Sequence, residues 1–529
     1  MISLLAVASA AAIAVYTVWR VPTAFGFDDW DPLATRTLGS ASDWLRPHYD
    51  HPAIVLTVIY RVLFHFFGLV SLPFQLVAIV LHVAACLLMA VLLRRSGVRE
   101  AIVLASTVTL LFLGTAYQNI TYAFGMSYGG ALAFGFLAVI LLDHEGPYDR
   151  RNILALAAGL TALGWSNVGI TMTVFATLVL LLRRRFRDAL AHTGPLAALF
   201  VVWWVTQPHS STGFASVDAV GRFLRAHTWS TLSAVGRLPI TPFLVGALCL
   251  WGLWVAGRHT RSTSPEATPD PSDPPTINGV VALAASASAV FFAVSTAATR
   301  VLVPGWQVLW PASRYTGVLV FLLMPAIALG GEWLSSRSKV AGTLVVVLLI
   351  ASVPSNVRSL RDTGRSTAPT STGLDHYFLA APRLPAARTL DPALQVLPDL
   401  APGLTLGWLR GVLAQGRLPA PPELSPAVIS TYTLLLTAEA VTPDQGVIAD
   451  CRHITQPTLV TVSSPRAVTV INGSATVRLV WEGAASSPAR WLSAAYVPNV
   501  HRLLLAPVEL LVEPDDPTGA FDICLGVAT

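Results

Sequence analysis

The sequence predicts a polytopic α-helical membrane protein of about eleven transmembrane helices, followed by a C-terminal extracytoplasmic α+β region that ends in a small β-sandwich. The 529 residues are 54% hydrophobic and only 12% charged, whereas soluble domains carry about 25% charged residues. Long apolar segments alternate with short arginine-bearing loops, and the last stretch turns to short alternating segments separated by turn residues. These observations exclude an ordinary soluble enzyme. The net charge of +5 lies largely in the loops and does not indicate nucleic-acid binding.

Eleven apolar segments are candidate spans, although several fall short of the ~20 residues that a perpendicular helix needs. The first could instead be a cleaved signal peptide, but it lacks a positive n-region and further spans follow it. The weakest two are separated only by Ser166-Asn167. The segments are 2–19, 72–93, 101–114, 126–142, 152–165, 168–182, 190–207, 241–257, 278–297, 315–333 and 340–354.

The distribution of arginine predicts the orientation of these spans. If the N-terminus is cytoplasmic, the inner loops carry 13 Lys and Arg in 48 residues, and the outer loops carry nine in 112. Positive residues are enriched in cytoplasmic loops. We therefore expect a multi-pass protein of the cell membrane with a cytoplasmic N-terminus and an extracytoplasmic C-terminal domain.

Residues 53–70 would break this alternation if they formed a span. Thr57, Arg61 and His65 lie four residues apart, with Tyr60 beside them, and make a polar stripe on an otherwise apolar helix. An interfacial helix at the outer surface explains the stripe. A true span whose stripe faces a cavity is the alternative.

Composition divides the chain into three parts: a transmembrane domain at 1–357, a Pro-rich helical connector at 358–445 and a β-sandwich at 446–529. Within the last part, Asn472-Gly473 is the clearest hairpin turn. Cys451 and Cys524 lie near its two ends and could form a disulfide outside the cytoplasm. The predicted strands are GVIAD, TLVTV, AVTVI, ATVRLVWEG, HRLLLAP and VELLVEP.

The first outer loop, residues 22–52, concentrates polar chemistry at the membrane edge. It holds five aspartates, two histidines and two tryptophans. Aspartate and tryptophan are also ordinary interfacial residues, so any one of them could be structural. As a group they indicate function, because carboxylates near hydrocarbon are costly. They are Asp28, Asp29, Asp31, Asp43, Asp50, His48, His51, Trp30 and Trp44.

This arrangement resembles the GT-C superfamily of membrane glycosyltransferases. The similar features are a first span, a long outer loop that opens with an acidic pair, an amphipathic helix in that loop and a multi-span bundle. Residues 44–97 are similar to the RP…G…H…RR pattern of the O-mannosyltransferase-like, tetratricopeptide-associated members, at Arg46-Pro47, Gly68, His82 and Arg94-Arg95. The segment SRYTGVLVFLL at 313–323 resembles the Arg-Tyr that opens a late span in many such enzymes.

The resemblance implies an inverting transferase that uses a polyprenyl-phosphate sugar as donor at the outer face. Such a transfer needs a carboxylate to take the proton of the acceptor hydroxyl. Asp28 matches the first acidic position of the family loop and is expected to be this base. Asp29 would orient Asp28, hold the acceptor or bind a metal. Asp50 is a second candidate for either task, and the flanking His48 and His51 are expected to bind substrate.

The departing lipid phosphate needs positive charge or a metal. Arg300 and Arg314 are the natural candidates, because guanidinium groups bind phosphate oxygens bidentately, although arginines at this depth also snorkel to headgroups. Trp306 and Tyr315 could stack on the sugar or line the lipid groove, or belong to an aromatic belt. A divalent ion, Mg²⁺ or Mn²⁺, is an alternative without assigned ligands. The second outer loop, AYQNITYAFGMSYGG, lacks the acidic residue that the family often has there.

The sequence thus predicts a membrane glycosyltransferase that moves a sugar from a polyprenyl-phosphate carrier to a cell-envelope glycan, lipid or protein. Its expected partners are that donor, the acceptor and membrane lipid. The terminal sandwich resembles carbohydrate-binding appendages of actinobacterial cell-wall transferases, with Trp481, Trp491 and Tyr496 as a sugar platform or as core residues. The alternatives are a transporter or flippase of lipid-linked sugars and a non-catalytic glycan-binding scaffold.

Overall fold

The computed structural model divides the chain into two compact units, Met1–Phe66 with Ser71–Ser371, and Phe67–Val70 with Thr372–Thr529. The predicted boundary at 357/358 falls inside a helix that runs from Lys339 to Ala380. The structure describes residues 1–20, 25–48, 51–144, 146–207, 216–262, 278–301, 312–388, 390–397, 401, 403–425, 428–429, 432–433, 436, 438–441, 446–447, 451–456, 458–462, 466–471, 475–480, 489–490, 501–504, 508–514 and 521–528.

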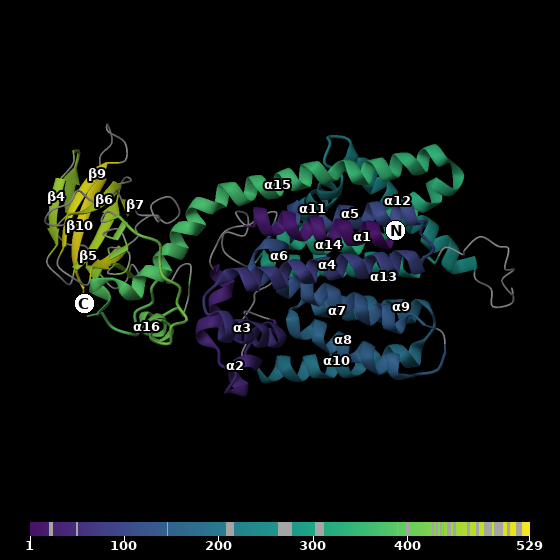
Figure 1. Cartoon of the computed structure of the whole chain (residues 1–529), viewed down its shortest axis with the longest axis horizontal. Helices are drawn as coiled ribbons and strands as arrows, with labels where there is room; N and C mark the ends of the chain where they lie inside the picture. Colours follow the sequence, from purple (N-terminus) through teal and green to yellow (C-terminus); the bar gives the residue numbers. More distant parts are fainter. Residues whose placement is uncertain are drawn as a thin grey trace. The chain divides into compact units, whose positions relative to one another are not determined.

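The first unit is a bundle of membrane-length helices (Figure 1). Within the described residues, nine helical segments are long and apolar enough to cross a membrane, which confirms the polytopic helical class. They are α1 (Ile2–Trp19), α4 (Ser71–Arg95), α5 (Glu100–Leu111) with α6 (Tyr117–Thr121), η4 (Ala123–Gly125) with α7 (Met126–Leu142), α10 (Phe186–Thr206), α12 (Thr241–Ser262), α13 (Val280–Arg300), α14 (Ser313–Arg337) and α15 (Lys339–Ala380).

The two weakest predicted spans are the short helices α8 (Arg150–Trp165) and α9 (Val168–Leu182). They are separated where the sequence predicted a break, because Ser166 has an extended backbone with φ −173° and ψ 175°. Both pack against α7. At about 1.5 Å per residue, helices of 16 and 15 residues extend only about 24 and 22 Å. This accounts for the difference between the eleven predicted spans and the nine segments of full length.

Helix α3 (Ile54–Phe67) carries the polar stripe and is too short to count among these nine segments. Thr57 and Tyr60 are buried. The guanidinium of Arg61 donates a hydrogen bond to the carbonyl of Leu33, at 2.7 Å, in the preceding loop. Tyr60 and Arg61 therefore contact the first outer loop, whereas His65 of the same stripe is exposed. The interfacial position of this helix stays a prediction.

Helix α14 is the centre of the bundle. Of the residues in its apolar 18-residue segment, 83% are buried, against 22% for the corresponding segments of α1 and α10. It packs against α12, α13, α5 and α11 (Val217–Val235). The crossing with α12 depends on two glycines: a Cβ on Gly252 would overlap the carbonyl oxygen of Ala326, and one on Gly330 would overlap that of Leu248. Small residues let helices approach this closely in membranes.

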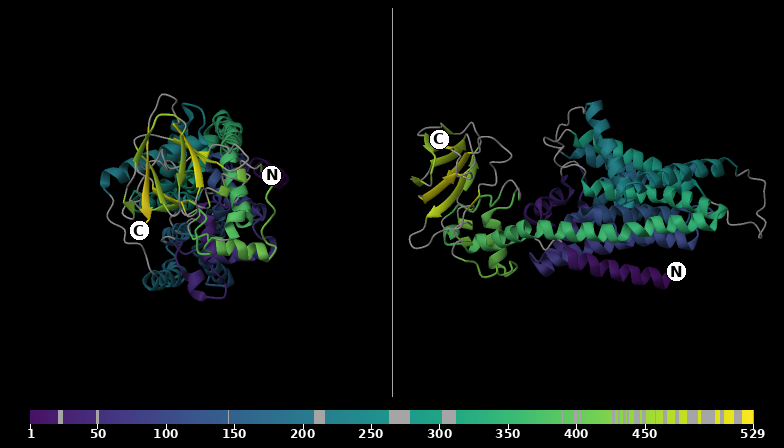
Figure 2. Two further views of the ribbon diagram at one scale, coloured as in Figure 1. Left: turned by 90° about the vertical axis from the view of Figure 1, so that its left-hand side faces the viewer. Right: turned by 90° about the horizontal axis from the view of Figure 1, so that it is seen from above.

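The loops gather at two opposite ends of the bundle (Figures 1 and 2). At one end, Arg99 pairs with the buried Glu332 at 2.8 Å, and Arg183 pairs with Asp143. These are loops that the arginine count assigns to the cytoplasm. At the other end, the segments after α1, between α5 and α7 and around the start of α14 meet. All three were predicted as outer loops.

The second unit contains helix α16 (Leu406–Ala414) and two antiparallel sheets, as predicted for a small sandwich. One sheet has the order β1-β8-β5-β10-β2, with β3 on β10, and the other has the order β4-β9-β6-β7. The strands are β1 (Ala438–Val441), β2 (Gly446–Val447), β3 (Cys451–Ile454), β4 (Thr458–Val462), β5 (Arg466–Ile471), β6 (Ala475–Val480), β7 (Ala489–Arg490), β8 (His501–Leu504), β9 (Val508–Pro514) and β10 (Phe521–Ala528).

The predicted hairpin at Asn472-Gly473 is wrong. Strand β5 pairs with β8 and β10, whereas β6 pairs with β7 and β9 in the other sheet. The short connection therefore crosses between sheets, which is common in sandwiches, where consecutive strands change sheet. The turn itself lies outside the described residues, as do Trp481, Trp491 and Tyr496.

Cys451 and Cys524 occupy the same register position of the antiparallel strands β3 and β10. Cys451 is disulfide-bonded. The predicted pairing with Cys524 fits this register, and we retain it as a proposal.

The α12–α14 crossing predicts unequal effects for the same substitution at two positions of one helix. Gly252→Ala must push α12 away from α14, and overpacking of this kind costs about 1–3 kcal/mol, so its thermal midpoint in lipid should fall by several degrees. Gly257→Ala is the matched control, because no atom lies within 4 Å of the added methyl group. Equal midpoints for the two variants would contradict the close crossing.

Candidate functional site

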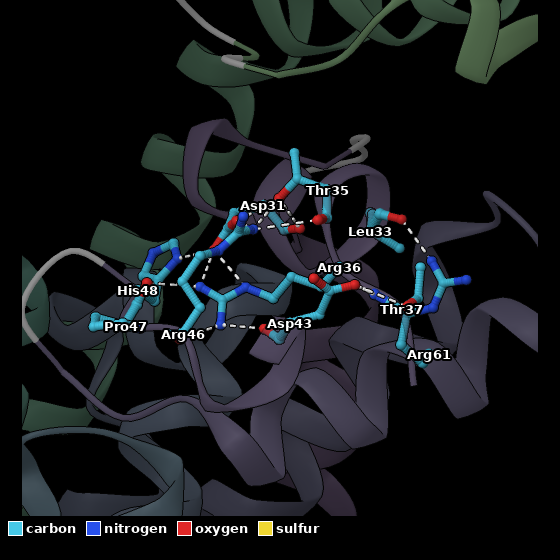
Figure 3. Close-up of polar contacts among 10 residues, drawn as sticks. All are labelled: Asp31, Leu33, Thr35, Arg36, Thr37, Asp43, Arg46, Pro47, His48 and Arg61. Atoms are coloured by element: carbon cyan, nitrogen blue, oxygen red, sulfur yellow. Dashed lines mark hydrogen bonds and ion pairs between the residues drawn. The ribbon is translucent and has the colours of Figure 1, made fainter. Parts of the chain in front are cut away.

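The candidate site lies at the end of the bundle where the first outer loop meets α14. The loop is built from η1 (Phe27–Asp29), η2 (Asp31–Thr35) and α2 (Ala41–Leu45). Figure 3 shows its polar contacts, which converge on Asp31 and Arg36.

Arg36 organises this loop from inside. Its side chain is only 1% exposed and pairs with Asp31 through two nitrogens. It also donates to the backbone carbonyls of Asp43, Arg46 and Pro47. A buried cation is tolerated when its hydrogen bonds are satisfied in this way. The two ends of the loop are thereby held together.

Asp31 is fully engaged by its neighbours and is not available to a substrate. Besides Arg36, it accepts hydrogen bonds from Arg46 at 3.0 Å, from Thr35 at 2.6 Å and from His48 Nδ1 at 2.8 Å. Burial acts to raise the pKa of Asp31, but the hydrogen bonds from His48 and Arg36 outweigh it and hold the pKa well below its usual range. The sequence placed Asp31 in the polar group of the loop but assigned it no catalytic or binding role.

Asp28 is also partly exposed and has two cationic neighbours, but neither of them lies closer than 3.5 Å. Its side chain is 23% exposed; one oxygen lies 3.7 Å from His48 Nε2 and the other 3.5 Å from Arg314 Nη1. Burial acts to raise its pKa, but His48 and Arg314 outweigh this effect and lower the pKa of Asp28 below its ordinary value. Asp28 is therefore an ionised carboxylate in the substrate-free protein.

Asp29 faces the opposite way, into the protein. It is 2% exposed and accepts hydrogen bonds from Tyr60 Oη and from the backbone N–H of Gly26. Burial raises the pKa of Asp29 to about 7, although both hydrogen bonds act to lower it. Its contacts support an orienting role: Asp29 fixes the turn that presents Asp28. Tyr60 was seen in the sequence as part of the α3 stripe but not as the partner of this aspartate.

His48 and His51 bracket a tight turn, because each backbone N–H donates to the carbonyl of the other. His48 is 4% exposed, and its ring lies 4.9 Å from that of Phe124. Burial acts to lower the pKa of His48, but Asp28 and Asp31 outweigh it and raise the pKa above its usual value. Burial, together with the charges of His48 and Arg300, lowers the pKa of His51 to about 3, so His51 is neutral. Asp50, between them, lies outside the described residues.

A polar cavity of about 150 Å³ adjoins this turn. It brings together three predicted site residues: His51 from the loop, Arg300 at the end of α13 and Tyr315 at the start of α14. No aspartate or glutamate is among the described residues that line it. The sequence missed the other polar lining residues, although it marked one signal for them, the break at Ser166-Asn167. They are Tyr128, Ser166, Asn167, Thr171, Ser295, Thr296 and Thr299.

The two arginines differ in their surroundings. Within the described part of the chain, the side chain of Arg300 makes no hydrogen bond or ion pair. Arg314 contacts Asp28, and its backbone is held by the second outer loop: Asn119 donates to its carbonyl at 2.8 Å and Gln118 accepts from its N–H at 3.3 Å. The second loop thus lacks an acid but positions an arginine. Trp306 lies outside the described residues.

The described side chains of the site do not suit a divalent ion. No group of three or more His, Cys, Asp or Glu side chains among the described residues is arranged to hold a metal. The carboxylates of Asp29 and Asp31 are occupied by hydrogen-bond donors, and Asp28 faces an arginine. Oxygen-ligated cations need several free carboxylate or carbonyl oxygens. We therefore derive no step through a metal.

Comparisons with known proteins give little further constraint. No family model matches the chain, and no curated protein matches it. Among solved structures, the chain is similar to ArnT from Cupriavidus metallidurans, crystallised in the apo state. The two share 14% sequence identity with a TM-score of 0.47, over 94% of this chain and 97% of that chain. At these values the likeness carries no argument about activity, which has to come from the residues of the site.

The pKa of Asp29 predicts a pH dependence of stability. Because the pKa is about 7 in the folded protein and about 3.9 in an unfolded chain, the folded state holds a proton that the unfolded state has released at intermediate pH. The contribution of Asp29 to stability is therefore complete below about pH 4 and is lost as the pH rises to about 7.

Asp29→Asn cannot titrate, so the thermal midpoint of the wild type relative to Asp29→Asn should fall between about pH 4 and pH 7. The comparison cancels the titration of the other groups, provided both proteins are measured in the same lipid. A difference between the two midpoints that stays constant over this range would refute a raised pKa at Asp29.

Proposed function

We propose that this protein is a membrane glycosyltransferase that moves a sugar from a polyprenyl-phosphate carrier to a hydroxyl of a cell-envelope glycan, lipid or protein. The observation that carries the proposal is the position of Asp28, an ionised and partly exposed carboxylate that contacts Arg314 near a cavity lined by Arg300, with no acidic side chain among the described lining residues. A base next to an anion site is what transfer from a phosphate-linked sugar requires.

The reaction is a single displacement. The acceptor oxygen attacks the anomeric carbon of the sugar, and the bond from that carbon to the phosphate oxygen breaks. The electron pair of the broken bond leaves with the lipid phosphate. Asp28 takes the proton of the acceptor hydroxyl. Attack opposite the leaving group inverts the anomeric configuration.

Arg300 and Arg314 would neutralise the leaving phosphate. Arg300 is available to an anion, because its side chain has no partner in the described part of the chain. Arg314 is shared: in the substrate-free protein its Nη1 lies 3.5 Å from Asp28. A donor phosphate that binds Arg314 would withdraw this cation from Asp28, raise the pKa of the carboxylate and make it a better base. The donor would thus activate the base when it binds.

Two apolar cavities lie next to the polar one and have lining residues in common with it or with each other. The nearer, of about 280 Å³, shares Ile170 with it, and the farther, of about 500 Å³, shares Leu163 and Phe200 with the nearer one. Their walls come from α3 and from α8, α9 and α10. Apolar space next to a polar chamber suits a phosphate joined to an isoprenoid chain.

The site faces the outside if the arginine-rich loops are cytoplasmic, as the positive-inside rule indicates. Sugar donors on polyprenyl carriers are then reached from the outer leaflet. The same orientation places the C-terminal sheets outside, where the proposed disulfide would be stable.

Sugar transfer should depend on Asp28. In purified protein in lipid, offered a panel of radiolabelled polyprenyl-phosphate sugars and a membrane-extract acceptor, Asp28→Asn should lower the transfer rate by ~10²-fold or more, as expected for loss of a general base. Asp43→Asn is the control, because Asp43 lies in the same loop and bonds only to Thr37 through its described side-chain contacts. Undiminished transfer by Asp28→Asn would move the base elsewhere. No transfer by the wild type from any donor would favour a transporter or a scaffold.

Donor binding should depend on Arg300. Wild-type protein should bind a polyprenyl phosphate more tightly than the corresponding polyprenol. Arg300→Ala should lower the affinity for the polyprenyl phosphate by about tenfold or more and leave the affinity for the polyprenol unchanged, since a charged hydrogen bond contributes about 1.5–3 kcal/mol. Arg222→Ala is the control, because this exposed arginine pairs with Asp218 on α11. Equal affinity of wild type and Arg300→Ala for the phosphate would exclude Arg300 from the anion site.

A further inference from the structure

The two cations beside Asp28 are held very differently. Arg314 approaches one carboxylate oxygen of Asp28 and has a second use in the proposed function, as a phosphate ligand. His48 approaches the other oxygen and is anchored on its far side by Asp31, through Nδ1 at 2.8 Å. The contact with Arg314 can be exchanged when substrate binds, whereas the contact with His48 is fixed by the structure of the loop.

The imidazole of His48 has little freedom to turn. Its side chain is 5% exposed, its ring lies against Phe124, and its backbone is bonded in both directions to His51. Asp31 cannot move away from it, because Arg36, itself 1% exposed, holds Asp31 in the centre of the loop. The direction of His48 Nε2, toward Asp28, therefore follows from the folding of the loop.

We propose that Asp31 and His48 form a fixed clamp on the base: Asp31 orients the imidazole, and the imidazole holds one oxygen of Asp28 so that the other faces the acceptor hydroxyl once Arg314 has turned to the phosphate. The proposal rests on the proposed function, in which Asp28 is the base. His48 is then a positioning residue and not a substrate ligand, which differs from the role that the sequence suggested for it.

The electrostatics of the group agree with this geometry. His48 lies between two carboxylates, which raise its pKa, and its charge in turn lowers the pKa of Asp28. The other charged or titratable groups around the pair come from every neighbouring element and stay in place in the variants below. They are Asp29, Arg36, Arg46 and His51 of the loop, Tyr60 of α3, Tyr128 of α7, Arg300 of α13, and Arg314 and Tyr315 of α14.

The test follows the titration of Asp28 itself. Infrared spectra of the full-length protein in lipid nanodiscs are recorded against pH, and the protonated-carboxyl band that disappears in Asp28→Asn is assigned to Asp28. In His48→Gln the midpoint of this band should rise by about one pH unit or more, because a cation within 4–6 Å typically lowers a carboxyl pKa by 1–3 units. Asp31→Glu, which keeps the negative charge beside Arg36 but displaces the imidazole from Asp28, should also raise the midpoint. Asp43→Asn should leave it unchanged.

An unchanged midpoint in both His48→Gln and Asp31→Glu, with folded protein shown by monodispersity and a cooperative thermal transition, would overturn the clamp. If His48→Gln does not fold, Asp31→Glu gives the same readout. In transfer assays, the acid limb of the pH–rate profile should move up with the band in His48→Gln, whereas a merely structural role would lower the rate without moving that limb. Because the band reports a carboxyl and not sugar transfer, it tests the clamp even if no donor is used and the proposed function fails.

Discussion

The buried ion pair between Arg36 and Asp31 is the interaction on which the site depends. Two charges at the edge of the membrane lose hydration, and removing one partner of such a pair typically costs 3–5 kcal/mol because the other is left uncompensated. Here the cost of burial is offset by complete hydrogen bonding, since Arg36 also satisfies three backbone carbonyls at the far end of the loop. The loop can therefore close in one way, and this closure brings His48 next to Asp28.

The same closure gives three aspartates in four residues three different roles. Asp31 is saturated by donors and serves as an anchor, and Asp29 is turned into the protein toward Tyr60. Asp28 is exposed to about the same extent as Asp31, but its contacts are longer, 3.7 Å to His48 and 3.5 Å to Arg314. The cations near Asp28 differ in how they are held. Asp31 anchors His48, Arg314 contacts Asp28 itself, and Arg300 lines the cavity. Asp28 is ionised in the substrate-free protein and would lose the contact with Arg314 when the donor phosphate binds. Its pKa would then rise, so that donor binding strengthens the base. We regard this coupling as the main mechanistic consequence of the geometry.

Much of the architecture could be predicted from the sequence, because apolar length and the placement of arginine are local properties. The membrane-length helices and the break at Ser166-Asn167 lie where those patterns indicated. The pairing of β5 and β6 could not be predicted, because an Asn-Gly turn signal does not reveal whether a connection stays in one sheet. Asp28 could be named as the base only from its place in the family loop, because the sequence alone does not show that Arg36 pairs with Asp31. The cavity was hidden for a similar reason, since its walls come from α7, α9, α13 and α14, which are distant in sequence.

The most direct test of this account is a cryo-electron microscopy structure of the protein in lipid with a polyprenyl phosphate bound. Density for the phosphate is expected in the polar cavity, within hydrogen-bond distance of Arg300. The guanidinium of Arg314 should be turned from Asp28 toward the phosphate, and His48 should still lie between Asp31 and Asp28. A phosphate bound elsewhere, or one in the cavity with Arg314 still paired to Asp28, would contradict it.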